Sequence, residues 1–140
     1  MEAYLDNSAT TKCADEVVDI MIKLMREDYG NPSSKHMKGV YAENYIKDAK
    51  KIIAASLKCL DKEIVFTSGG TESNNMAIIG SAMANKRKGN HLIVSSVEHS
   101  SVKEPFNYLE GQGFRVTYLP VDKDGIVSLD ALKEALDEET

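Results

Sequence analysis

Two polar stretches of this sequence combine residue types that can bind an anion or move a proton. The first, Ile64–Asn75, reads Ile-Val-Phe-Thr-Ser-Gly-Gly-Thr-Glu-Ser-Asn-Asn. Its apolar start, glycine pair and following apolar-periodic run predict a strand, a tight turn and a helix N-terminus. In that geometry, free backbone N–H groups and the positive end of the helix dipole surround an anion. Gly69 and Gly70 allow a ligand to approach closely, and the Thr71 hydroxyl can donate to a phosphate oxygen or cap the helix.

This turn matches neither of the two common phosphate-binding fingerprints. The P-loop pattern Gly-x-x-x-x-Gly-Lys-Ser/Thr is absent from the sequence, and so is the dinucleotide pattern Gly-x-Gly-x-x-Gly. The pattern therefore leaves two interpretations open. One is a phosphate site, and the other is a tight strand-to-helix connection without a ligand.

The second polar stretch is Glu98-His99, which follows an apolar segment, Leu92–Ser96, and precedes a predicted helix. Ligands of open parallel sheets bind beyond the carboxyl ends of the strands. We therefore expect His99 and the Gly70–Thr71 turn to face one crevice. An imidazole in that crevice can stack on a flat ring or transfer a proton near neutral pH. The alternative is that His99 is a structural residue.

The other histidines and the cysteines have a plainer interpretation. His91 stands at the start of a predicted strand and is expected to pack there, and His36 does not obviously join His99. Three histidines without acidic or cysteine partners at ligand spacing predict no metal site. Cys13 and Cys59 form no CxxC pair and are expected to be structural thiols in a reducing cytoplasm.

Helices and strands alternate along the chain. The predicted helices are Ala14–Asp28, Gly39–Leu57, Thr71–Lys86, Ser100–Gln112 and Leu129–Glu138, and the predicted strands are Ile64–Phe66, Leu92–Ser96 and Val116–Val121. Because these strands are apolar throughout, the pattern predicts an α/β fold with a parallel sheet covered on both faces. Such sheets usually have about five or six strands, so we expect the front part of a larger protein.

Composition narrows the classes of partner. The chain has 140 residues, of which 42% are hydrophobic and 28% charged, as in an ordinary globular domain. Its formal net charge of −5 argues against general binding to nucleic acid or to an anionic membrane. Apolar runs stay well below the roughly 18 residues that a membrane span needs.

Four motifs together resemble the opening of a cysteine desulfurase of the NifS/IscS type. They are Tyr4–Thr11, Tyr29–His36, Ile64–Asn75 and Val97–Val102. These enzymes form part of the class V aminotransferases, which are fold-type I pyridoxal 5′-phosphate enzymes. The resemblance covers nearly the whole chain. It implies a three-layer α/β/α, aspartate aminotransferase-like large domain with a mostly parallel sheet. Residues 1–140 would be the N-terminal segment and first half of that domain.

The resemblance also implies roles for individual residues. Gly70 and Thr71 correspond to the pair that binds the cofactor phosphate. His99 corresponds to the histidine that stacks on the cofactor's pyridine ring and assists proton transfer, which makes it both a cofactor-binding and a catalytic candidate. Glu72 and Asn75 match the start of the helix and are expected to support the turn.

Two further segments match parts of the family that fold over the mouth of the active site. One contains Asn7, Ala9 and Thr10, and the other is Tyr29–Ser34. The lysine that holds the cofactor, the aspartate at its pyridine nitrogen and the nucleophilic cysteine correspond to positions beyond residue 140. Neither Cys13 nor Cys59 corresponds to that nucleophile. We therefore expect the chain alone to be inactive on cysteine.

The resemblance implies a function for the whole enzyme. Sulfur is removed from L-cysteine to give alanine and an enzyme persulfide for iron–sulfur cluster assembly or thiolation. The expected partners are a sulfur acceptor, such as an iron–sulfur scaffold protein, and a second copy of the enzyme in a homodimer. Two alternatives remain. One is a relative acting on selenocysteine or cysteine sulfinate, and the other is a non-catalytic binding module that keeps half of the fold.

Overall fold

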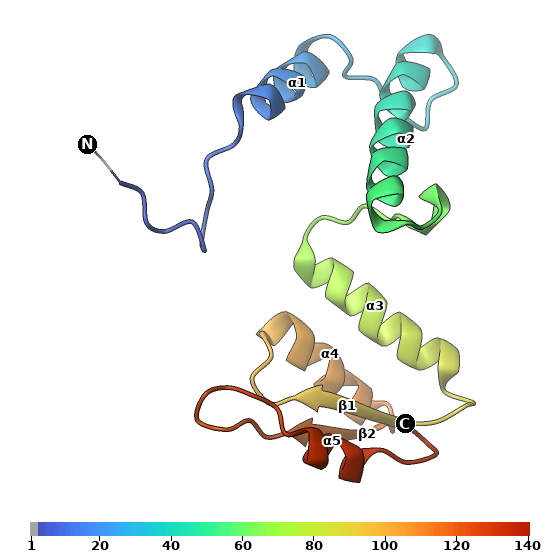
Figure 1. Ribbon diagram of the computed structural model, residues 1–140. Helices are drawn as coiled ribbons and strands as arrows, with labels where there is room; N and C mark the ends of the chain where they lie inside the picture. The colour runs from blue at the N-terminus through green and yellow to red at the C-terminus, as the bar shows by residue number, and fades with distance from the viewer. Residues whose placement is uncertain (1–2) are drawn as a thin grey trace. The chain divides into compact units, whose positions relative to one another are not determined.

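The computed structural model describes residues 3–140, which form two compact units (Figure 1). The first unit ends at Val65 and the second begins at Phe66. Each unit is described by itself below. Within residues 3–140, every helix is too short or too polar to cross a membrane.

The first unit consists of helices. They are α1 (Asp15–Arg26), α2 (Met37–Leu57) and the short 3-10 helix η1 (Asp61–Glu63). Helix α1 has acidic residues in its first turn and basic residues in its last turn, which complements the helix dipole. Helix α2 begins two residues earlier than predicted because His36 caps it, with its ring nitrogen Nδ1 accepting from the N–H of Gly39 at 3.4 Å.

The loop Tyr29–Ser34 packs closely against the start of α2, and two glycines permit this contact. A Cβ atom added to Gly30 would lie 2.2 Å from the carbonyl oxygen of Lys38. A Cβ atom added to Gly39 would lie 2.2 Å from the carbonyl oxygen of Ser34. The neighbouring atoms belong to the backbone and cannot rotate away. Both positions therefore require glycine.

The second unit is α/β. It contains α3 (Gly70–Asn85), β1 (His91–Ser95), α4 (Ser100–Gly111), β2 (Arg115–Leu119) and α5 (Leu129–Ala135). The two strands pair in parallel, from His91 opposite Arg115 to Ser95 opposite Leu119. Helices α3 and α4 lie on one side of the strands and α5 on the other (Figure 1). The predicted parallel α/β arrangement, with helices on both faces, is therefore confirmed.

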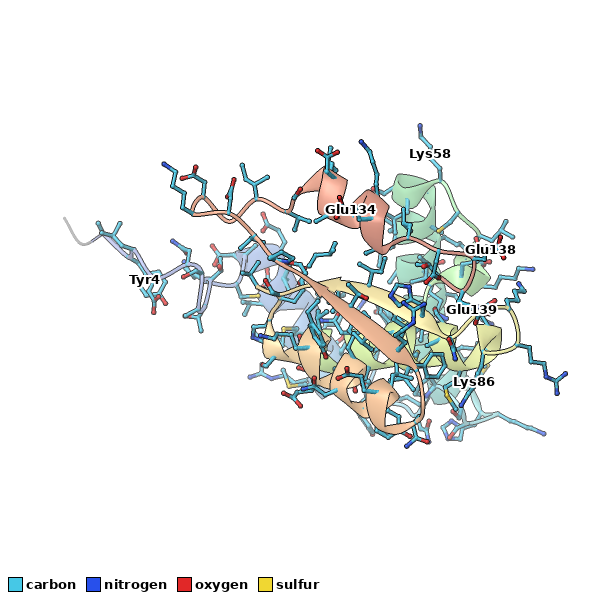
Figure 2. The ribbon with its side chains drawn as sticks, turned by 90° about the horizontal axis from the view of Figure 1, so that it is seen from below. Tyr4, Lys58, Lys86, Glu134, Glu138 and Glu139 are labelled. Atoms are coloured by element: carbon cyan, nitrogen blue, oxygen red, sulfur yellow. The ribbon has the colours of Figure 1, made fainter. Side chains whose placement is uncertain are left out.

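A small apolar core holds the second unit together. Leu109 of α4 is fully buried and packs with Ala82 of α3 and with Phe114, the residue before β2. Partly buried Ile78, Ile79 and Leu92 surround these three side chains. At the surface of the unit, the Lys86 ammonium lies 5.2 Å from the centre of the Phe114 ring and donates to the carbonyl of Gln112 at 2.9 Å. Figure 2 labels Lys86 among the charged side chains.

The prediction of a strand at Ile64–Phe66 is wrong. Ile64 has an extended backbone, but no strand within residues 3–140 pairs with this segment, and the side chain of Phe66 is 51% exposed. A strand exists only as part of a hydrogen-bonded ladder, so an apolar and extended sequence is not sufficient. The sheet described here accordingly has two strands instead of three.

The remaining elements differ from the prediction mainly at their ends. Strand β2 ends at Leu119 because Pro120 has no N–H to donate to a ladder, and Val121 instead forms an antiparallel bridge with Val127. Helix α5 ends at Ala135, three residues before the predicted end at Glu138.

Candidate functional site

The N-terminus of α3 presents three backbone donors without an acceptor. Gly69 caps the helix with an extended backbone and no side-chain hydrogen bond, and the first helical bond runs from the N–H of Ser73 to the Gly69 carbonyl at 3.1 Å. Within residues 3–140, the N–H groups of Gly70, Thr71 and Glu72 donate to no protein acceptor. Such donors, together with the helix dipole, attract a negatively charged group.

The space beside this turn is open. A Cβ atom added to Gly69 or to Gly70 would meet no heavy atom within 4 Å. Packing in the described chain therefore does not demand glycine at either position, in contrast to Gly30 and Gly39. Room for a ligand next to the free N–H groups agrees with an anion such as a phosphate group.

Side chains within the turn hold its backbone in place. The carboxylate of Glu72 accepts from both the N–H and the hydroxyl of Ser68, each at 2.6 Å. These two hydrogen bonds lower the pKa of Glu72 below its usual value, and the bond from the Ser68 hydroxyl has the larger effect. The amide of Asn75 donates to the carbonyl of Thr71 at 2.8 Å. The expectation that Glu72 and Asn75 support the turn is confirmed.

A shallow cavity joins the starts of α3 and α4. It has a volume of about 150 Å³ and is lined by Thr71, Asn75, Ser100, Ser101 and Glu104. The first two residues come from α3 and the others from α4. The carboxylate of Glu104 accepts from the amide of Asn107 at 3.3 Å. The Thr71 hydroxyl therefore lies near the N-termini of two helices.

His99 is the N-cap of α4 and lies directly before the α4 residues that line this cavity. Its side chain is exposed, and its Nδ1 atom accepts from the N–H of Ser101 at 3.1 Å. The same Nδ1 atom lies 2.9 Å from the Ser101 hydroxyl, which accepts from the amide of Asn74 at 2.9 Å. In the described part of the chain, the other ring nitrogen, Nε2, has no protein partner.

Asn74 and Ser101 were not identified as site residues from the sequence. A serine two residues after a capping histidine is a local signal that could have indicated the contact between Ser101 and His99. The bond between Asn74 and Ser101 joins residues 27 positions apart, and no local pattern predicts it.

The two segments expected at the mouth of the active site belong to the first unit. In one, the N–H groups of Ala9 and Thr10 both donate to the carbonyl of Asp6. In the other, Asn31 makes a turn in which its side chain accepts from the N–H of Ser33 at 2.9 Å. Both segments form local turns, as their turn-prone residues suggest.

His91 lies away from the anion-binding turn, at the start of β1. Its side chain is fully buried, and its two ring nitrogens lie 2.8 Å from the Thr140 hydroxyl and 2.7 Å from the Thr117 hydroxyl. The expectation that His91 packs at a strand start is confirmed. Within residues 3–140, no group of three His, Cys, Asp or Glu side chains is placed to hold a metal ion.

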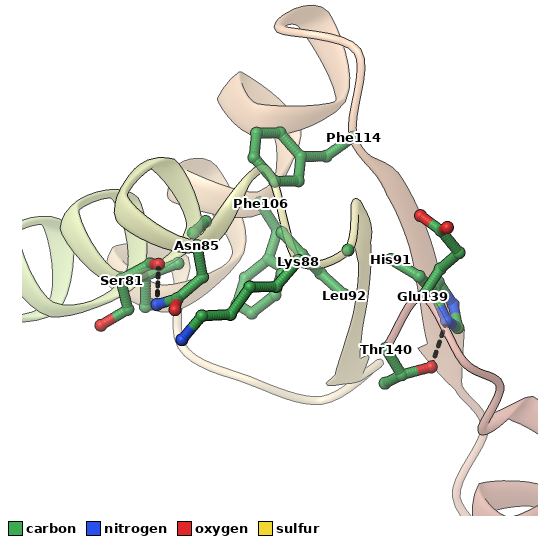
Figure 3. A pocket seen from close by; sticks show the side chains of 12 residues that line it. Ser81, Asn85, Lys88, His91, Leu92, Phe106, Phe114, Glu139 and Thr140 are labelled. Carbon is green, nitrogen blue, oxygen red and sulfur yellow. Dashed lines mark hydrogen bonds between the residues drawn. The ribbon is translucent and has the colours of Figure 1, made fainter.

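Another cavity lies beside His91 (Figure 3). It has a volume of about 440 Å³, and apolar side chains, including those of Phe106 and Phe114, form much of its wall. Its size does not make it the better candidate site. Its lining residues include no residue from the first turn of α3 or of α4, so no helix N-terminus opens into it.

The sequence matches the model of one protein family over almost its full length. The family is described as aminotransferase class-V, and the match covers residues 3–140. This is most of the chain, including both polar stretches singled out above.

Several curated proteins are similar to this chain. "Cysteine desulfurase IscS" of Methanosarcina thermophila is 52% identical over 137 residues, which is 98% of this chain and 34% of that protein. "Cysteine desulfurase IscS" of Dictyoglomus turgidum is 50% identical over 139 residues, which is 99% of this chain and 35% of that protein. The chain thus spans about a third of the length of these relatives.

Solved structures resemble the chain as well. One described as "NIFS-LIKE PROTEIN" is 39% identical with a TM-score of 0.91, covering 99% of this chain and 38% of its own. Another, "SspA in complex with cysteine", is 39% identical with a TM-score of 0.85, covering 94% of this chain and 38% of its own.

Proposed function

Because this chain belongs to the aminotransferase class-V family, we propose that it is the N-terminal part of a cysteine desulfurase. The whole enzyme removes sulfur from L-cysteine, leaves alanine and carries the sulfur as a persulfide on one of its own cysteines. Residues 1–140 supply the N-terminal segment and the first half of the cofactor-binding large domain. The observation that carries this proposal is the row of free N–H groups at Gly70, Thr71 and Glu72, which lies within a motif typical of these enzymes.

Class V aminotransferases depend on pyridoxal phosphate, and the residues at the start of α3 suit its phosphate group. The N–H groups of Gly70 and Thr71 and the Thr71 hydroxyl would bind the phosphate oxygens. The carboxylate of Glu72, in the first turn of α3, accepts two hydrogen bonds from Ser68. His99 would lie against the pyridine ring. When bound, the cofactor supplies an electron sink for carbanion chemistry at the substrate.

Catalysis requires groups that these 140 residues do not supply. The lysine that holds the cofactor and the cysteine that receives the sulfur correspond to later parts of the family sequence. Cys13 and Cys59 are free thiols within the described chain, but neither matches that cysteine. We therefore propose that this chain alone does not turn over cysteine.

The proposal that the chain is part of a cysteine desulfurase also implies partners and a cellular location. One of the similar solved structures is a complex with cysteine, the substrate that we propose for the whole enzyme. We further propose a homodimer, a sulfur-acceptor protein such as an iron–sulfur scaffold, and a location in the cytoplasm. The free state of both cysteines agrees with a reducing compartment.

A binding experiment tests the proposed phosphate-binding site directly. We call this site, made by the N–H groups of Gly70, Thr71 and Glu72 and the Thr71 hydroxyl, the cradle. The isotope-labelled chain is titrated with pyridoxal phosphate and, in parallel, with pyridoxal, which has the same ring but no phosphate. We expect the amide signals of Gly70, Thr71 and Glu72 to move with the first ligand and not with the second. Equal shifts with both ligands, or no shift at these amides, would contradict the cradle.

An activity assay tests the reaction. The chain is incubated with pyridoxal phosphate and L-cysteine, and sulfide and alanine are measured, alongside a polypeptide that extends this chain through the rest of the family sequence. We expect turnover by the extended polypeptide alone. Sustained turnover by the 140 residues would overturn the assignment of the missing groups. An extended polypeptide that turned over only selenocysteine or cysteine sulfinate would identify one of those relatives instead.

A further inference from the structure

Asn74, Ser101 and His99 form a chain of hydrogen bonds between α3 and α4. The amide Nδ2 of Asn74 lies 2.9 Å from the Ser101 hydroxyl, and this hydroxyl lies 2.9 Å from Nδ1 of His99. Asn74 and Ser101 are half-buried, whereas His99 is exposed. The chain therefore runs from the packed interface of the two helices to the imidazole at the surface.

The direction of these bonds follows from the chemistry of the groups. The amide NH₂ of Asn74 can only donate, so the Ser101 oxygen accepts from it. The hydroxyl proton of Ser101 is then free to point at His99 Nδ1. The backbone N–H of Ser101 also donates to this nitrogen, at 3.1 Å. A nitrogen that accepts carries no proton, so the proton of the neutral imidazole is on Nε2.

We infer that Ser101 and Asn74 are positioning residues for His99, which they hold as the Nε2–H tautomer with a fixed ring plane. The inference rests on the proposed function, in which the His99 ring lies against the cofactor. Nε2 is the ring nitrogen without a protein partner in residues 3–140, so it is the atom left to donate toward a ligand. A ring that is free to rotate would lose both its stacking geometry and its directed donor.

The same hydrogen bonds link the two parts of the site. Asn74 stands on the α3 helix that begins at Gly70, and Ser101 stands on the first turn of α4, which His99 caps. The Asn74–Ser101 bond thus joins the helix with the free N–H donors to the helix that carries the histidine. Substituting either residue should therefore disturb His99 without removing any donor from the cradle.

His36 provides an internal comparison. It also caps a helix through Nδ1, which accepts from the N–H of Gly39 at 3.4 Å. Within the described residues, no hydroxyl group bonds to its ring. The two histidines therefore differ in whether a hydroxyl group bonds to the ring, and this is the contact to which we assign the fixed tautomer and ring plane of His99.

Nitrogen NMR of the imidazole rings in the isotope-labelled chain tests this inference without cofactor. The chemical shifts of Nδ1 and Nε2 report which nitrogen carries the proton. We expect wild-type His99 to show an acceptor-type Nδ1 and a protonated Nε2. In Ser101→Ala, which keeps the backbone N–H but loses the hydroxyl, the minor tautomer should increase about fivefold, as the loss of one ordinary hydrogen bond permits.

Three further variants test whether the change in the His99 tautomer comes from the Ser101 hydroxyl and its orientation by Asn74. Ser101→Thr keeps a hydroxyl and should restore the wild-type His99 spectrum. Asn74→Ala leaves Ser101 in place but removes the donor that orients its hydroxyl, so it should give an intermediate change. Ser100→Ala makes the same chemical change one residue away and should leave His99 unaltered. The His36 signals should stay constant in all of the variants.

Two results would overturn the inference. One is a folded Ser101→Ala variant, judged by dispersed amide signals, whose His99 spectrum equals that of the wild type. The other is a wild-type His99 with its proton on Nδ1. Both outcomes are independent of cofactor binding, so a failure of the phosphate titration alone would reject the proposed function and leave the positioning roles standing.

Discussion

Thr71 is the side chain that most directly tests phosphate recognition. Its hydroxyl lies at the start of α3, beside the free N–H groups, and its substitution removes no packing from the core. We predict that Thr71→Ala weakens the binding of pyridoxal phosphate about tenfold or more, because a hydrogen bond to a charged group contributes about 1.5–3 kcal/mol. A titration followed by cofactor absorbance or amide shifts measures this change.

Thr71→Ser is the matched control for that prediction. It keeps the hydroxyl group and loses only a methyl group, so its affinity should stay within about threefold of the wild type. Equal affinities of the alanine and wild-type proteins would show that the hydroxyl does not contact the phosphate. The affinity for pyridoxal, which carries no phosphate, should be the same in all three proteins.

Gly70, Thr71 and His99 could be identified as candidate site residues from the sequence because their signals are local. A glycine pair before a helix and a histidine after a strand are signals that span a few residues. The structure places these residues at the starts of α3 and α4, where they were predicted to lie. Their roles toward a cofactor stay predictions. The hydrogen bond between Asn74 and Ser101 depends on how α3 and α4 pack against each other, and no short stretch of sequence encodes that packing.

At the scale of elements, the sequence predicted the five α-helices and both strands of the described structure, together with a third strand that does not form. Helical periodicity and capping residues are local properties, so these elements could be recognised. The segment Ile64–Phe66 failed because strand formation depends on a pairing partner elsewhere in the fold. Its composition has the β-forming character of a strand, but that character does not create the partner.

The link between the last residues and the sheet should depend on pH. Arg115 of β2 forms an ion pair with Asp137, and this hydrogen bond is the main reason that the pKa of Asp137 lies below its ordinary value of 3.8. A carboxylate with a lowered pKa in the folded state stabilises that state above its unfolded pKa. The contribution is then lost as the pH falls from about 4 through the folded value.

We predict that the segment Asp137–Thr140 separates from β1 in this acidic range. The N–H of His91 donates to the carbonyl of Glu139 at 3.0 Å, so its hydrogen exchange should report the separation. Asp137→Asn should show faster exchange at neutral pH and a weaker dependence on acid. Asp130→Asn, at an exposed pair with Lys133, serves as the control. Identical acid profiles for the wild type and Asp137→Asn would contradict the prediction.

At the scale of the whole molecule, the chain consists of two compact units, and the second has an apolar core. The apolar core formed by Ala82, Leu109 and Phe114 belongs to the second unit. Leu109 is fully buried there, so Leu109→Ala should reduce the free energy of unfolding of this unit by about 2–5 kcal/mol. Urea denaturation followed by circular dichroism measures the loss.

Hydrogen exchange can show whether this loss stays within one unit. We expect faster exchange in α4 and β2 of Leu109→Ala but unchanged exchange in α2, which lies in the first unit. Leu129→Ala makes the same change at a side chain that is 70% exposed, and it should cost less than about 1 kcal/mol. Parallel acceleration in both units would show that they unfold together.

Two pairs of glycines in this chain should behave differently in a mutational scan. Gly30 and Gly39 have backbone atoms 2.2 Å from any added Cβ, so every replacement should lower the amount of folded protein. Gly69 and Gly70 have nothing within 4 Å, so their replacement should leave the amount of folded protein unchanged and reduce cofactor retention. A scan that scores abundance and cofactor content separately would therefore distinguish glycines selected for folding from glycines selected for binding.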